Sequence, residues 1–545
     1  MDRRVFLKAM ATAGVVGLVD PMALLVRRAR ASGKYLSLHP FIEAHPEAVF
    51  IKRTGVLVKT DSEAKKQEGL KLAQELFTSG DTPDISLCAI KPNLTCLGGD
   101  ATADRLGIVT DPDFVEGMVE GMKGLGLQAD RIYLREGNFL NDAYCPQSQA
   151  LDWYQPLATR TGAHLTDFDS GRDMTQSGVS RTNLQEGTEV IWREVPDGVV
   201  FRRIGYVAPI NAPDAWNLNI SKLKTHGMGV TLCCKNWQGT NINPYVHYCS
   251  PVPGQVSSGL PTQDLNPNYR EDVEAIYSQH LEAGVPRWDR PGSIDNWNSG
   301  RGMETWVQKT LDNHSASNHG LSIIEGIYGR DGNWMEGPHD GKSMDFMTNV
   351  LIFGKSPFRV DIIGDWLAGH EPGNFGLFHS AIDRGLLDAL NPMGIPLYRW
   401  ENGVPTRTLL TGFERTPLVT YYMQRDYAGQ SEPKWHLVDE PFDYGPLTSV
   451  EVAQDAKPRS YLLAQNAPNP FNASTAIEYG IPRDGYVSLD VYNSRGQRVD
   501  VLVDGWQRKG VHMASWNAGK RASGTYLYRF RTNGFEETRK MVLVR

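Results

Sequence analysis

The chain has 545 residues, a formal net charge of −7 at pH 7 and 40% apolar residues, which suits two to four globular domains. A nucleic-acid partner is not expected, because neutralising phosphates requires a net basic face. The six cysteines include no C-x-x-C pair, so we expect no cysteine-ligated iron–sulfur cluster.

Residues 1–31 have the pattern of an export signal. Two early arginines precede a weakly apolar run over 9–26, and residues 29–31 (Ala-Arg-Ala) offer a cleavage site. "RRVFLK" resembles the twin-arginine signal, which usually carries proteins already folded in the cytoplasm. An uncleaved membrane anchor is the alternative, but Asp20 opposes it, because a charge at the bilayer centre costs about 2.5–3.5 kcal/mol. After processing we expect no stable transmembrane helix, because no other stretch approaches the length of a span.

The next zone, residues 32–455, predicts an α/β core. "FIKRTGVLVKT" has a strand pattern, and "DSEAKKQEGLKLAQELFTSG" predicts a helix that ends at Gly80. "DISLCAIKPNL" predicts a buried strand, Asp111 and Pro112 begin another helix, and "ADRIYLREGN" predicts a further strand. This alternation predicts a mostly parallel sheet with flanking helices. Ligands of such sheets gather at the carboxyl ends of the strands.

"LNISKLKTHGMG" is the most informative stretch. Strand alternation puts Lys222, Lys224 and His226 on one face, and the glycines that follow let backbone amides approach a ligand closely. Cations beside such a turn suit a small anion, whereas alternate lysines are also typical of a solvated face. The predicted ligand-binding residues are Lys91, Asn93, Lys222, Lys224, Lys235 and Asn236.

Several motifs in this zone resemble those of the domain-of-unknown-function 362 family. They are "IKPNL", "SKLKTH", "KNWQG", "SIIEGIYGRDGNWMEGPHDG" and "FRVDIIGDWLAGHEP", and the resembling core covers about residues 40–450. Ser221 stands where the family usually has Pro, and Glu325 where it usually has Asp. The resemblance implies the fold but no reaction, because the family has no settled activity.

Acid/base residues and metal ligands are candidates within the same motifs. His226, Glu325 and Asp361 are the predicted catalytic groups, because a carboxylate near lysines stays ionised and suits a base. His226, Asp361 and His370 are candidate ligands of a divalent metal. No local spacing such as H-E-x-x-H supports the metal, so both possibilities stay open.

Residues of about 245–318 look like an insertion, rich in Pro, Asn, Gly and Trp, with helical patterns in "REDVEAIYSQHLEA" and "METWVQKTLDNH". We expect this insertion to form a rim over the carboxyl edge of the sheet. Its tryptophans either bind flat ligands or pack, and packing is favoured.

The last zone, residues 461–545, changes to short alternating strands separated by glycines, which predicts an immunoglobulin-like β-sandwich. "NPFN", "NSRGQRV", "GTYLYRF" and the terminal "KMVLVR" resemble the type IX secretion sorting domain. An ordinary immunoglobulin-like stalk is the alternative.

Together these patterns predict a protein exported through the periplasm to the cell surface or the medium, with the twin-arginine and type IX secretion machineries as partners. The best hypothesis for its activity is an enzyme that acts on a small anionic substrate, with assistance from a metal as an option. The alternative is a non-catalytic surface protein that binds a ligand or a metal.

Overall fold

The computed structural model describes residues 35–544 except 81–83, 95–102, 138–146, 166–183, 228, 243, 246–250, 287–290, 297, 334, 423–425, 428–429, 432, 445–460, 467–468, 472–473, 508, 520 and 533. The predicted export signal lies outside the described residues, and so does part of the "NPFN" motif. No helix among the described residues is long and apolar enough to cross a membrane.

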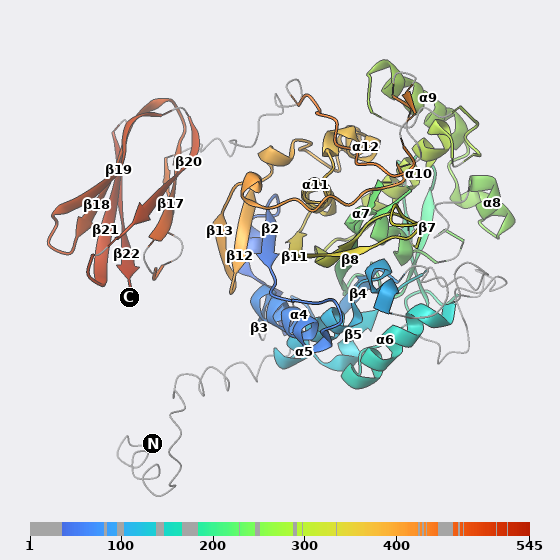
Figure 1. Ribbon diagram of the computed structural model, residues 1–545, viewed down its shortest axis with the longest axis horizontal. Coiled ribbons are helices and arrows are strands. Elements are labelled where there is room, and N and C mark those ends of the chain that lie inside the picture. Colours follow the sequence, from blue (N-terminus) through green and yellow to red (C-terminus); the bar gives the residue numbers. More distant parts are fainter. Residues whose placement is uncertain are drawn as a thin grey trace, which may run out of the picture.

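A nine-stranded sheet forms the centre of the larger unit, in the order β13-β12-β2-β11-β10-β8-β4-β5, with β9 paired to β8 (Figure 1). Its strands are β2 (Val49–Arg53), β4 (Cys88–Pro92), β5 (Ile132–Leu134), β8 (Trp216–His226), β9 (Gly229–Thr231), β10 (Leu321–Arg330), β11 (Asp345–Gly354), β12 (Leu397–Glu401) and β13 (Val404–Arg407).

The prediction of a mostly parallel sheet is wrong, because the sheet is mixed. Strands β5, β4, β8 and β10 are parallel to one another, but β11 lies antiparallel between β10 and β2, and β13 and β9 are antiparallel to their neighbours. The physical reason is the connection after β10. The described residues between β10 and β11 (331–333 and 335–344) make tight backbone turns rather than a crossover helix, so β11 returns directly beside β10.

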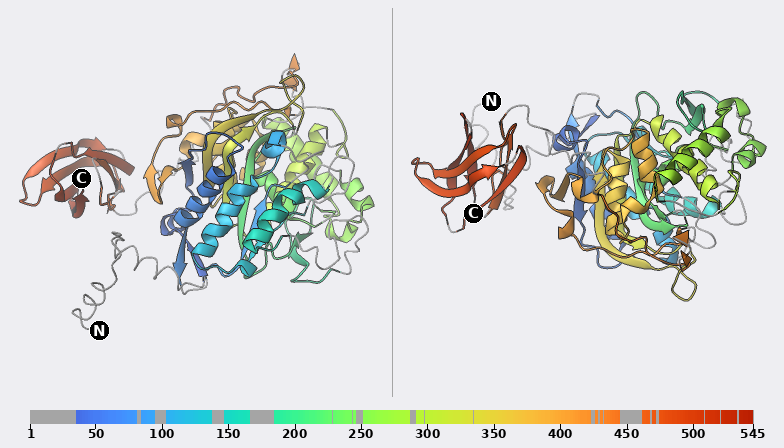
Figure 2. Two further views of the ribbon diagram at one scale, coloured as in Figure 1. Left: turned by 60° about the horizontal axis from the view of Figure 1, so that its bottom comes forward. Right: turned by 90° about the horizontal axis from the view of Figure 1, so that it is seen from above.

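Helices cover both faces of this sheet, as an α/β fold requires (Figure 2). One layer contains α4 (Ser62–Leu76), α5 (Pro112–Gly124) and α6 (Gln147–Thr161), and the other contains α7 (Cys233–Asn236), α10 (Gly300–Ser315), α11 (Pro357–Leu367) and α12 (Gly376–Asp383). Each layer packs its own buried apolar core against the sheet.

Helices α4 and α5 begin where the sequence predicts, at the side-chain caps Asp61 and Asp111. The two helices pack so closely that a side chain at Gly69 or Gly117 would collide with the backbone of the other helix. The predicted end at Gly80 is wrong. The helix ends at Leu76, and the next four residues form β3 (Phe77–Gly80), which pairs with β1 (Tyr35–Leu38).

The region of the predicted insertion is helical, with α8 (Val252–Ser257), α9 (Tyr269–Glu282) and α10 in its described parts. Trp306 of α10 is buried in the core, whereas the other tryptophans of the insertion lie outside the described residues. The smaller elements are α3 (Pro40–Ala44), β6 (Val190–Glu194), β7 (Arg203–Val207), β14 (Asp426–Tyr427) and β15 (Gln430–Ser431).

The C-terminal unit contains antiparallel strands in two sheets, β16-β17-β20 and β19-β18-β21-β22. Its strands are β16 (Leu462–Leu463), β17 (Ser474–Ile481), β18 (Gly485–Asn493), β19 (Arg498–Gln507), β20 (Gly510–Asn517), β21 (Gly524–Thr532) and β22 (Phe535–Leu543). Both sheets contribute to one separate apolar core, with Trp516 and Tyr528 among its buried side chains.

Candidate functional site

Lys222 and Glu325 form a fully buried ion pair at the centre of the sheet. They face each other across β8 and β10, and Lys222 Nζ lies 2.9 and 2.8 Å from the two carboxylate oxygens. The amides of Asp111 and Ile327 also donate to this carboxylate, each at 3.1 Å. Burial lowers the pKa of Lys222 and raises that of Glu325, and the ion pair opposes both shifts.

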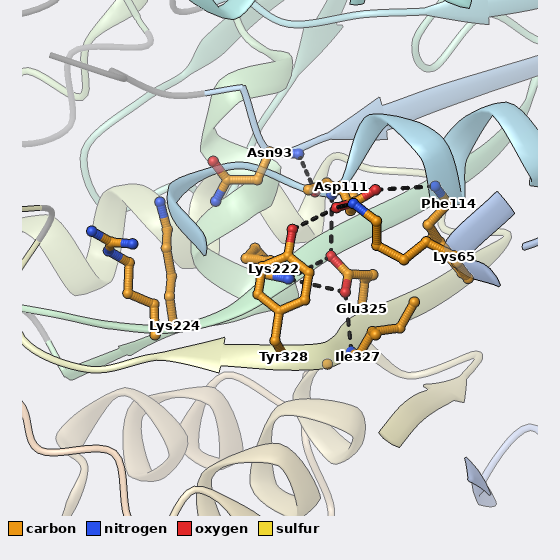
Figure 3. A network of polar contacts seen from close by, with 12 residues as sticks. Lys65, Asn93, Asp111, Phe114, Lys222, Lys224, Glu325, Ile327 and Tyr328 are labelled. Atoms are coloured by element: carbon orange, nitrogen blue, oxygen red, sulfur yellow. Dashed lines mark hydrogen bonds and ion pairs between the residues drawn. The ribbon is translucent and has the colours of Figure 1, made fainter. Parts of the chain in front are cut away.

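Tyr328, Asp111 and Lys65 surround this ion pair (Figure 3). Lys222 Nζ lies 3.3 Å from the centre of the Tyr328 ring, and the Tyr328 hydroxyl donates to Asp111. Lys65 of α4 also donates to Asp111, at 2.7 Å. Burial acts against the Lys65 ammonium, but the neighbouring aspartates outweigh burial and raise its pKa. These contacts make the pair part of the packing between the sheet and its helices.

Lys224, two residues further along β8, has a different partner because β10 bulges. Four residues of β10 lie between Glu325 and Arg330, whereas only Leu223 separates the paired positions on β8, so Lys224 faces Arg330. Gly326 and Gly329 permit the bulge, because a Cβ on either would press on neighbouring groups at about 3 Å or less. Lys224 therefore lies opposite a cation, whereas Lys222 lies opposite a carboxylate.

The Lys224 ammonium is buried and donates to the backbone carbonyl of Ile108 at 2.6 Å. Among the described residues no carboxylate forms an ion pair with it. Burial lowers its pKa well below the usual range, and the positive charges of Lys235 and Arg330 lower it further, whereas the charge of Glu136 opposes the shift. A buried amine among cations is energetically unfavourable when protonated unless an anion joins it.

His226 and Lys235 complete what we call the cationic cluster, namely Lys224, His226, Lys235 and Arg330. The His226 residue is partly exposed at the end of β8. Burial of its ring lowers its pKa well below the usual value, as do the charges of Lys235 and Lys224. The charge of Lys235 lowers the pKa of both Lys224 and His226, so we group these side chains by their electrostatic coupling. Arg330 already forms an ion pair with the carboxylate of Asp345, and its Nη1 lies 2.7 Å from Asp345 Oδ1.

Lys91 belongs to an adjacent, balanced group. Its ammonium donates to Glu136 at 2.8 Å and to Asn236 Oδ1 at 3.0 Å, and Asn236 Nδ2 donates back to the Lys91 carbonyl at 3.1 Å. The amide of Asn93 donates to Thr110 at 2.8 Å. Lys91 and Asn236 therefore hold β4 to α7 at the edge of the cationic cluster.

The Asp361 side chain, which belongs to α11, caps the N-terminal end of helix α7. Its two carboxylate oxygens accept the amides of Cys233 and Cys234 at 2.8 and 2.7 Å. Burial raises its pKa to about 7, and the two amides oppose that shift. This geometry gives Asp361 a structural contact with the helix that carries Lys235.

His370 has both ring nitrogens engaged by the backbone. Nε2 donates to the Leu418 carbonyl at 2.8 Å, and Nδ1 accepts the amide of Val438 at 3.1 Å. Burial lowers its pKa to about 3. Among the described residues no group of three or more His, Cys, Asp or Glu is arranged to hold a metal ion. The predicted metal site therefore has no support from the geometry.

Several residues that shape the site are not predicted from the sequence as site residues, chiefly Arg330, Ile108 with its carbonyl, Asp111 and Glu136. Arg330 follows Glu325 in the motif already singled out, and the two glycines between them were a signal for a bulge. Nothing in the sequence pattern pairs Glu136 with Lys91, because those residues meet only through the sheet.

The family model described as "Domain of unknown function (DUF362)" matches residues 88–364, which is more than half of the chain and includes the cationic cluster. The chain belongs to this family. Membership in the DUF362 family agrees with the four sequence motifs between β4 and β11. No curated protein matches the chain.

Similar solved structures include dimeric latent PorU from Porphyromonas gingivalis, at 24% identity over 16% of this chain and 9% of that one, with a TM-score of 0.14. PorZ from the same organism, described as a surface component of the type-IX secretion system, matches at 13% identity over 17% and 12%, with a TM-score of 0.12. The chain thus spans about a tenth of each protein. The endo-β-1,4-mannanase from Thermotoga petrophila is 9% identical over 91% and 98%, with a TM-score of 0.20. None of these scores indicates a shared overall fold.

We expect replacement of the two neighbouring lysines to lower the stability by different amounts. Lys222→Met leaves the buried Glu325 carboxylate without its cation, so the free energy of unfolding should fall by about 3–5 kcal/mol. Lys224→Met leaves one buried carbonyl without its hydrogen bond but no carboxylate without its cation, so the loss should be about 1–3 kcal/mol and smaller than that of Lys222→Met. Urea denaturation of both variants measures the difference. Equal losses would contradict the assignment of Lys222 to structure and Lys224 to the site.

Proposed function

We propose that the protein binds a small anion at the cationic cluster and that it is an enzyme acting on a small anionic substrate. The observation that carries the proposal is the position of Lys224, a buried amine that faces Arg330 across the sheet and has a carbonyl as its hydrogen-bond partner. A carboxylate or phosphate at this position would supply the missing negative charge.

The place of the cluster also favours ligand binding. It lies at the carboxyl end of β8, where ligands of α/β sheets gather, and His226 and Lys235 retain part of their exposure there. A neutral His226 beside the bound anion would hold or move a proton, which supports an enzyme over a protein that only captures its ligand. Glu325 is less suited to that role, because its two oxygens already accept from Lys222 and two amides.

We also propose that the protein is exported folded and then delivered to the cell surface or the medium. The early pair of arginines, the apolar run and the cleavage site within residues 1–31 support the first step. The ordered motifs over 461–545 support a type IX sorting domain with an immunoglobulin-like fold. The two antiparallel sheets with a common core are compatible with that fold.

Binding of an anion should stabilise the wild-type protein in proportion to the logarithm of its concentration, reaching about 2.7 kcal/mol at a hundred times the dissociation constant. Phosphate, sulfate, pyruvate and lactate are suitable probes, and the melting temperature measures the effect. Lys224→Met should abolish the shift, because the variant lacks the amine that the anion balances. The control is Lys71→Met, which removes an exposed lysine of α4 and should leave the shift unchanged. A full shift in Lys224→Met would contradict the proposed site.

Export should depend on the two early arginines. Replacing Arg3 and Arg4 by lysine keeps the charge but removes the pair that the twin-arginine machinery reads, so the precursor should accumulate in the cytoplasm of its host. Fractionation followed by immunoblotting measures this. Removing residues 461–545 is the matched control, and it should leave the protein in the periplasm. Unchanged export of the lysine variant would contradict the proposed route.

A further inference from the structure

We propose that the Lys224 amine forms an imine with a carbonyl compound that also carries a carboxylate, namely a 2-oxo acid. This inference rests on the proposed anion site, because the carboxylate of the compound would occupy the cationic cluster. It goes further by assigning a covalent step to one atom, Lys224 Nζ.

The contacts of Lys224 differ from those of the other buried lysines around it. Lys222, Lys65 and Lys91 each donate to a carboxylate, at 2.7 to 2.9 Å. Lys224 donates instead to the Ile108 carbonyl. A neutral amine with one hydrogen engaged in this way is held in place and keeps its lone pair for a carbon atom.

The surroundings favour the neutral form that a nucleophile needs. Burial lowers the pKa of Lys224 well below the usual range, and Lys235 and Arg330 add to that shift. A desolvated lysine beside another cation is a recurring way to make an amine reactive near neutral pH. The bulge in β10 provides this arrangement, because it puts Arg330 opposite Lys224.

A 2-oxo acid matches the cluster because its carboxylate is bonded directly to the carbonyl carbon. A carboxylate attracted by the charge of Lys235, which acts on Lys224, would bring the adjoining carbonyl carbon toward the Lys224 amine. A phosphate or sulfate would balance the same charges but would have no carbon for the amine to attack.

The reaction balances without a redox partner. The Lys224 lone pair forms a nitrogen–carbon bond as the carbonyl π pair moves to oxygen, and one proton moves from nitrogen to oxygen to give a carbinolamine. The hydroxyl group then takes up a proton and leaves as water, and the nitrogen lone pair forms the protonated imine. Neutral His226, two residues further along β8, would carry the proton between nitrogen and oxygen.

The test is reductive trapping on the full-length chain. Pyruvate and sodium cyanoborohydride are added at pH 7, and peptide mapping by mass spectrometry measures modification at each lysine. Hydride transfer to the imine carbon gives a secondary amine, so the modified residue gains the mass of pyruvic acid less one oxygen atom. Lys224 should be modified several-fold faster than exposed Lys71, because its lowered pKa leaves more of its amine neutral at pH 7.

Lactate separates this inference from the proposed function, because it has the carboxylate but no carbonyl. Lactate should raise the melting temperature and slow the trapping of Lys224 without forming an adduct. Stabilisation by both acids with no adduct at Lys224 would overturn the imine and leave the anion site standing. Modification of lysines only in proportion to their exposure, with no stabilisation by either acid, would overturn both. Because the modification of Lys224 and Lys71 is compared in the same wild-type protein, the test does not depend on the folding of a variant.

Discussion

The bulge in β10 is the constraint on which the rest of the site depends. A regular strand would continue the pairing of β10 with β8 one residue at a time after Glu325 and Lys222. The bulge shifts that register, so that Arg330 and not its predecessors lies opposite Lys224. Gly326 and Gly329 make this shift possible, because Val350, Leu223 and Leu418 leave no room for a side chain at these positions.

Two lysines on one face of one strand consequently have different physical roles. Lys222 is balanced by a carboxylate, covered by an aromatic ring and held between sheet and helices, so its charge is part of the fold. Lys224 is equally buried but faces a cation, and such an arrangement persists only where the surrounding structure enforces it. The same logic separates Lys91, which Glu136 balances, from the cluster beside it. Lys224 is therefore the lysine of β8 that has no ion-pair partner among the described residues.

The sequence predicted the layers of the fold and the shared face of the β8 lysines, because both depend on local periodicity. It failed on the direction of β11, because strand direction depends on how a connection folds and not on the pattern of the strand itself. Glu325 was predicted as a catalytic group, but its contacts with Lys222 and two amides appear only when the strands are paired. Asp361 and His370 were grouped as metal ligands, whereas backbone amides and carbonyls occupy their polar atoms.

The most direct test is the pKa of the Lys224 amine, measured from the pH dependence of its acetylation by acetic anhydride with and without saturating phosphate. The fold disfavours the ammonium, so Lys224 should titrate well below the ordinary lysine value of about 10.4, and the free energy of unfolding should rise with pH up to that value. Bound phosphate favours the ammonium, so its presence should raise the pKa. A pKa equal to that of exposed lysines, unchanged by phosphate, would contradict the account.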